Sequence, residues 1–114
     1  MMDEVSYTAF IADNTDFIYE TIQQERDRQD VKWGYPQLNT FCEWASILGE
    51  EYGELAKELN ELNFGRGDTH KMIEEAFHVA AVAVSIIEHA EVAALVTEQM
   101  NNNREGINHD TSKV

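Results

Sequence analysis

The sequence predicts an all-α fold, a helical bundle with three to four helices per chain that is completed by oligomerisation. The chain has 114 residues, which is the length of one domain. Residues 40–63 repeat apolar side chains every three or four positions, as an amphipathic helix does. Ala76 to Ile87 is apolar around most of a helical circumference, which suits a central helix or one buried against another subunit. The last observation implies an obligate oligomer.

The first predicted helix covers residues 15–32 and opens the main domain, which we place at residues 14–100. Asn14 or Thr15 is its expected cap, and Gly34 is its expected stop. Pro36 disfavours helical geometry at the residue before it, so a loop follows. Residues 1–13 lack clear periodicity and form an N-terminal extension, whereas residues 101–114 have little apolar content and form a flexible C-terminal tail.

The second and third predicted helices cover residues 40–63 and residues 69 to at least 89. Thr40 and Glu43 match a capping box at the start of the second helix. Gly65 lies in the turn that ends this helix, and Asp68 or Thr69 caps the third. Neither Gly nor Pro interrupts residues 89–99, so the pattern leaves open whether residues 91–100 continue the third helix or form a fourth.

Charge and composition exclude several classes of function. Eight Lys and Arg residues against 22 Asp and Glu residues give a net charge of -14, which argues against binding to nucleic acid. No apolar stretch approaches the roughly 18 residues that span a bilayer, and the N-terminus lacks the basic and apolar regions of a signal peptide. The lone Cys42 fits a reducing compartment. We therefore expect a cytoplasmic protein with no membrane partner.

Two pairs of polar residues carry the chemistry that the sequence offers. Glu51 and Glu54 are three residues apart on the second helix, so they share a face, and Glu58 extends the line. Glu75 and His78 have the same spacing on the third helix. If the two helices pack antiparallel, the pairs meet in the bundle core and form an oxygen-rich site that favours Mg²⁺ or Mn²⁺. The alternatives are a solvated helix face for the carboxylates and a hydrogen-bonded core histidine.

These residues carry a family resemblance. The segments GEEYGEL at 49–55 and EAFHV at 75–79 are similar to the Glu-Glu-x-x-Glu and Glu-x-x-Asp signature of the MazG-like all-α nucleoside triphosphate pyrophosphohydrolases. The segment ERDRQDVKWG at 25–34 resembles the opening of small bacterial and phage members. The similarity covers about residues 20–90.

The resemblance implies a role for each residue of the motif. Glu51, Glu54 and Glu75 would be metal ligands, and Glu50 would be an auxiliary carboxylate that orders or deprotonates the attacking water. Glu50 also has the simpler interpretation of a solvated helix face. His78 stands where the usual motif has Asp, and a neutral imidazole is a softer, less charged ligand that weakens Mg²⁺ and favours Mn²⁺, or lies outside the metal shell.

The same resemblance implies a Mg²⁺-dependent homodimer or homotetramer that hydrolyses a (d)NTP to (d)NMP and pyrophosphate, in house-cleaning or nucleotide-pool control. Lys32 would pair with a phosphate, Trp33 would stack on the base, and Asn39 would read a base edge. A surface lysine, a core or interface tryptophan and a helix cap are the alternatives. A non-catalytic oligomerisation or nucleotide-sensing module of the same fold is the competing hypothesis for the chain. The sequence does not reveal base or sugar preference.

Overall fold

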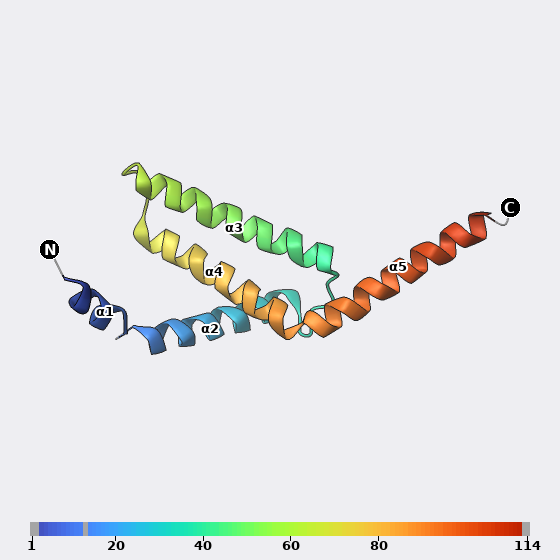
Figure 1. Ribbon diagram of the computed structural model, residues 1–114, viewed down its shortest axis with the longest axis horizontal. Helices are drawn as coiled ribbons and strands as arrows, with labels where there is room; N and C mark the ends of the chain where they lie inside the picture. The colour runs from blue at the N-terminus through green and yellow to red at the C-terminus, as the bar shows by residue number, and fades with distance from the viewer. Residues whose placement is uncertain (1–2, 13, 113–114) are drawn as a thin grey trace.

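The computed structural model describes residues 3–12 and 14–112, and within these ranges every regular element is a helix. This confirms the all-α class, although the structure has five helices where three to four were predicted (Figure 1). The helices are α1 (Glu4–Ala12), α2 (Thr15–Trp33), α3 (Phe41–Asn63), α4 (Thr69–Glu88) and α5 (Ala90–Ser112).

Helix α4 is the centre of the body of the molecule. It packs against α3 on one side and α2 on the other, and α3 and α4 run antiparallel as a hairpin (Figure 1). The small buried core joins Trp44 of α3, Val82 of α4 and Ala93 of α5. The two neighbours of α4 cover part of its nearly all-round apolar surface, but Ile73 and Ile87 stay 42% and 75% exposed.

The turn between α3 and α4 is tight and is built on two glycines. Gly65 has a φ of 74°, a conformation that side chains rarely adopt. A Cβ atom at Gly67 would lie 2.7 Å from Cγ of Leu62, so no side chain fits there without a shift. Asp68 then caps α4, because its Oδ1 accepts a 2.9 Å hydrogen bond from the N–H of His70. The predicted turn and cap are confirmed.

The sequence also predicted where α2 begins and ends and where α3 begins. Asn14 is the N-cap residue of α2, and Gly34, at φ 93°, ends it by donating its N–H to the carbonyl of Asp30 at 2.8 Å. Thr40 and Glu43 form the predicted capping box, with reciprocal hydrogen bonds of 3.1 and 3.0 Å. These local signals fix both ends of the loop at residues 34–40.

The N-terminal extension differs from the prediction, because residues 4–12 form α1. Asp3 caps it by accepting a 2.8 Å hydrogen bond from the N–H of Ser6. The described side chains of α1 are all exposed, and its sequence carries no periodic signal.

At the other end of the chain, a break at His89 settles the question of residues 91–100: they belong to a separate helix, α5, which continues into the predicted tail. Helices α4 and α5 are bent by 70° at this break, and α5 projects from the body (Figure 1). The molecule is therefore elongated, with extents of 74 × 30 × 27 Å.

The described helices were also compared with the length and apolar character of a membrane span. None of them meets both requirements alone. Helix α4 together with Ala90–Arg104 of α5 meets them only as a pair, and this pair contains the 70° bend.

Candidate metal centre

The structure brings the four predicted metal ligands together. Glu51 and Glu54 come from α3, and Glu75 and His78 come from the facing side of α4. One ligand atom of each residue lies within 4.8 Å of the others. The antiparallel hairpin is what joins the pairs, because each pair occupies one face of its own helix. Glu58 lies outside this cluster, where it is buried and paired with Nζ of Lys71 at 3.5 Å.

The distances within the cluster suit a small octahedral cation. Nδ1 of His78 lies 3.1 Å from Oε2 of Glu75 and 3.5 Å from Oε2 of Glu51. Ligands at about 2.1 Å from Mg²⁺ are about 3.0 Å apart when adjacent and about 4.2 Å apart when opposite. The Oε2 atom of Glu51 is buried and accepts no hydrogen bond from the described residues. An orphaned anionic oxygen among carboxylates is a donor set that a hard cation would satisfy.

The charges at the cluster are unfavourable without a cation. Burial raises the pKa of Glu51, and the nearby carboxylates of Glu54, Glu75 and Glu25 raise it further. The charge of His78 acts in the opposite direction but does not outweigh them. The site thus holds negative charge at a cost to the fold, which a bound divalent ion would offset.

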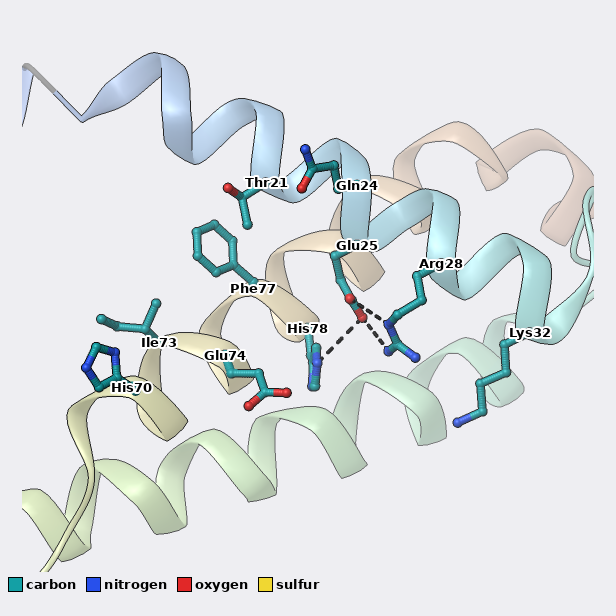
Figure 2. A pocket seen from close by; sticks show the side chains of 10 residues that line it. All are labelled: Thr21, Gln24, Glu25, Arg28, Lys32, His70, Ile73, Glu74, Phe77 and His78. Carbon is teal, nitrogen blue, oxygen red and sulfur yellow. Dashed lines mark hydrogen bonds and ion pairs between the residues drawn. The ribbon is translucent and has the colours of Figure 1, made fainter.

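A fifth residue, Glu25, was not predicted as part of the site. It comes from α2, and its Oε1 lies 3.6 Å from Nε2 of His78, on the ring nitrogen other than the one that faces Glu75 (Figure 2). Arg28 donates hydrogen bonds of 2.6 and 2.8 Å to the two oxygens of Glu25, and Gln29 donates one of 3.1 Å. Burial favours the neutral acid, but these hydrogen bonds and the charges of His78 and Arg28 outweigh it and lower the pKa of Glu25.

An open groove of about 800 Å³ lies between α2 and α4 beside this cluster (Figure 2). Glu25, Arg28 and His78 line its centre, and Lys32 lines one end. Nζ of Lys32 also lies 5.2 Å from the centre of the Trp33 ring, in a cation–π contact. The predicted phosphate-binding lysine therefore faces the groove and also touches the predicted stacking residue.

Three predicted residues meet in a second, smaller pocket of about 330 Å³ at the end of α2. Trp33, Asn39 and Glu50 line it together with the ligand Glu51. Trp33 is partly exposed there, and the Nδ2 of Asn39 donates a 3.5 Å hydrogen bond to Oε1 of Gln37. Asn39 does not cap α3, since Thr40 occupies that position. Of the three predicted substrate-binding residues, Lys32 lines the groove and not this pocket.

Comparison of the chain with protein-family models, with curated proteins and with solved structures gives no match in any of the three.

Proposed function

We propose that this chain is a Mg²⁺-dependent nucleotide pyrophosphohydrolase of the MazG-like all-α family, a cytoplasmic enzyme of nucleotide-pool control. It would convert a (d)NTP and water to (d)NMP and pyrophosphate. The observation that carries the proposal is the convergence of Glu51, Glu54, Glu75 and His78, with one buried carboxylate oxygen that accepts no hydrogen bond from the part of the chain that the structure describes. Carboxylates are the ligands that Mg²⁺ and Mn²⁺ prefer, and nucleoside triphosphates reach enzymes as complexes of such ions.

The roles of the residues follow from their places around the cluster. Glu51, Glu54, Glu75 and His78 would hold the ion, which when bound would neutralise charge on the triphosphate. Glu50 is exposed and lines the smaller pocket beside Glu51, where its carboxylate can order the attacking water or take its proton. The chain then needs no further acid or base in that pocket.

The smaller pocket is the proposed base site. The indole of Trp33 offers a stacking face, and the side-chain amide of Asn39 offers a donor and an acceptor to a base edge. Lys32, beside Trp33, would contact the phosphates from the groove. Both openings adjoin the metal cluster, since Glu51 lines one and His78 the other.

Self-association into a homodimer or homotetramer is the second part of the proposal. Large apolar side chains are exposed on elements that have few neighbours, among them Phe17 of α2 (64%) and Leu95 of α5 (67%). Such faces are usually covered by another subunit. Light scattering at micromolar concentration should give a dimer or tetramer, and a monodisperse monomer would contradict this part.

The competing function is a nucleotide-sensing or oligomerisation module of the same fold that has lost turnover. The feature that favours it is His78, an uncharged or cationic group where the family motif has a carboxylate. A module of this kind would bind a nucleotide in the same pocket and leave it intact.

A pyrophosphate-release assay separates the two functions. The eight common NTPs and dNTPs would each be tested with Mg²⁺ and with Mn²⁺. Pyrophosphate release by the wild-type chain that is lost in Glu51→Gln and Glu54→Gln supports the enzyme. Nucleotide binding in calorimetry without release supports the sensing module, and release that persists in both variants would place the chemistry elsewhere.

A further inference from the structure

His78 has a carboxylate beside each of its two ring nitrogens. Nδ1 forms a 3.1 Å hydrogen bond with Glu75 and lies 3.5 Å from Glu51, whereas Nε2 lies 3.6 Å from Glu25, at the distance of an ion pair. A neutral imidazole carries one N–H and one lone pair, so only one of its nitrogens can donate and only the other can bind a cation. The surroundings of the ring must therefore decide which nitrogen turns its lone pair to the metal centre.

Glu25 is held in place on the Nε2 side. The two Arg28 hydrogen bonds and the Gln29 amide fix its carboxylate, and its side chain is only 12% exposed. Gln29 also reaches the backbone carbonyl of His78 at 3.5 Å, which ties α2 to α4 at this level. Figure 2 shows Glu25 between Arg28 and His78, at the wall of the groove.

We propose that Glu25 is a positioning residue for the metal centre: when a cation displaces the Nδ1–Glu75 hydrogen bond, Glu25 accepts the Nε2–H of His78 and leaves the Nδ1 lone pair directed at the cation. This inference rests on the proposed metal centre and adds a residue to it. A carboxylate that orients a metal-bound histidine in this way fixes both its tautomer and its ring orientation.

Glu25 acts through His78 and not as a ligand of its own. The cluster of ligand atoms within 4.8 Å, searched over the described residues, comprises Glu51, Glu54, Glu75 and His78 without Glu25. The imidazole ring separates Glu25 from these carboxylates, since it contacts Glu25 by Nε2 and the others by Nδ1. A positioning role therefore predicts that Glu25 contributes nothing to metal binding once the imidazole is gone.

A double-mutant cycle with Mn²⁺ alone as the probe tests this directly. Mn²⁺ affinity would be measured by EPR titration of the full chain for wild type, Glu25→Ala, His78→Ala and the double variant. Pulsed EPR of the bound Mn²⁺ would report coupling to a histidine nitrogen. Glu25→Gln keeps the shape and one acceptor oxygen in case Glu25→Ala folds poorly. Glu20→Ala, at an exposed position of the same helix, is the control for loss of one negative charge.

We expect Glu25→Ala to lower Mn²⁺ affinity by about 10- to 100-fold and to weaken the nitrogen coupling. Glu25→Gln should lose less, Glu20→Ala should match wild type, and the double variant should bind Mn²⁺ as His78→Ala does. Equal losses from Glu25→Ala with and without His78 would overturn the inference and leave the metal centre standing. The inference would also be overturned if the Mn²⁺ bound to the wild-type chain showed no coupling to a histidine nitrogen. A wild-type chain that binds no Mn²⁺ would overturn the metal centre and the inference together.

Discussion

The backbone N–H of Gln37 donates a 3.1 Å hydrogen bond to Nε2 of His89, 52 residues further along the chain. Nδ1 of the same ring is then the donor to the carbonyl of Ser85, at 2.8 Å. The ring is buried and also contacts Tyr35 and Trp44, with centroids 5.5 and 5.7 Å away. One imidazole thus joins the loop that forms the smaller pocket to the bend between α4 and α5.

Replacing this ring should destabilise the chain. His89→Ala removes two buried hydrogen bonds and the packing of the ring, so we expect a loss of about 2–4 kcal/mol in the free energy of unfolding. Urea denaturation followed by circular dichroism would measure it. His70→Ala, at an exposed position, should change stability by less than about 0.5 kcal/mol. Equal stability of the two variants would show that His89 does not hold the loop.

We expect the Glu51 carboxylate to destabilise the metal-free protein. Its pKa is raised above the ordinary carboxyl value near 4.5, so ionising it costs more in the folded chain than in the unfolded one. Glu51→Gln should therefore stabilise the metal-free chain at pH 7 while abolishing Mg²⁺ binding. Thermal melts with EDTA and with Mg²⁺ would show both effects. A variant that is less stable than wild type in EDTA would contradict the assignment of strain to this carboxylate.

The pH dependence of this difference has a defined sign. Below about pH 4.5 Glu51 is protonated in both states, so wild type and Glu51→Gln should differ least. As pH rises through the elevated folded pKa, wild type loses stability relative to the variant, and the difference then stays constant. Melts in EDTA from pH 4 to 8 would trace it. A difference that shrinks with rising pH would mean that the pKa of Glu51 is lowered instead.

Glu50→Gln should separate turnover from metal binding. Glu50 lines the pocket but lies outside the ligand cluster, so its loss should lower kcat by about 10²- to 10⁴-fold and change Mg²⁺ affinity by no more than about twofold. Glu54→Gln is the matched comparison, because it removes a ligand and should abolish both. A Glu50 variant with wild-type kcat would leave Glu50 as part of the solvated face of α3.

His78→Asp tests whether an anionic ligand at this position holds the ion more tightly than the imidazole. An added anionic oxygen should tighten Mg²⁺ by about tenfold and reduce any preference for Mn²⁺, since affinity rises with ligand charge. The metal-free variant should be less stable than wild type, because Glu25, Glu51 and Glu75 would then face a fourth carboxylate. Isothermal titration with each metal and a melt in EDTA would measure both. Unchanged affinities in His78→Asp and His78→Ala would make His78 a packing residue.

Trp33→Ala should weaken nucleotide binding without affecting the metal. Loss of one base-stacking surface, worth about 1–3 kcal/mol, would raise KM by about 5- to 150-fold. Trp33→Phe should recover most of the loss. Tyr19→Ala removes an exposed aromatic residue elsewhere on α2 and should leave KM unchanged. A KM that is insensitive to Trp33 would move the base site away from the smaller pocket.

The structure shows which parts of the fold local chemistry specifies. The capping box at Thr40, the cap at Asp68 and the stop at Gly34 were all predictable, because each depends on residues within four positions. Helix α1 was missed because its described side chains are exposed and give no periodic pattern. The sequence left open the break at His89, where the ring accepts a hydrogen bond from Gln37 that no local pattern contains.

The same distinction holds for the site. Glu51 with Glu54, and Glu75 with His78, are pairs within one helix, and a short turn predicts that they meet. Glu25 comes from a third helix whose packing the sequence does not specify. Its local trace is the spacing of Arg28 and Gln29 at three and four positions after it, which by itself predicts no contact with the metal ligands.

Gly67 has a consequence for how variation in this chain should be interpreted. The glycine sets how closely α4 can begin beside the end of α3, and the four ligand residues lie about two to three helical turns, or about 9 to 18 Å, along the two helices from the ends that flank the turn. A side chain there would tilt one arm of the hairpin, and the displacement would grow with distance along the arm. In a screen of random variants scored by metal retention, substitutions at Gly67 would therefore cluster with those of the ligands, although the residue touches no ion and carries no chemistry.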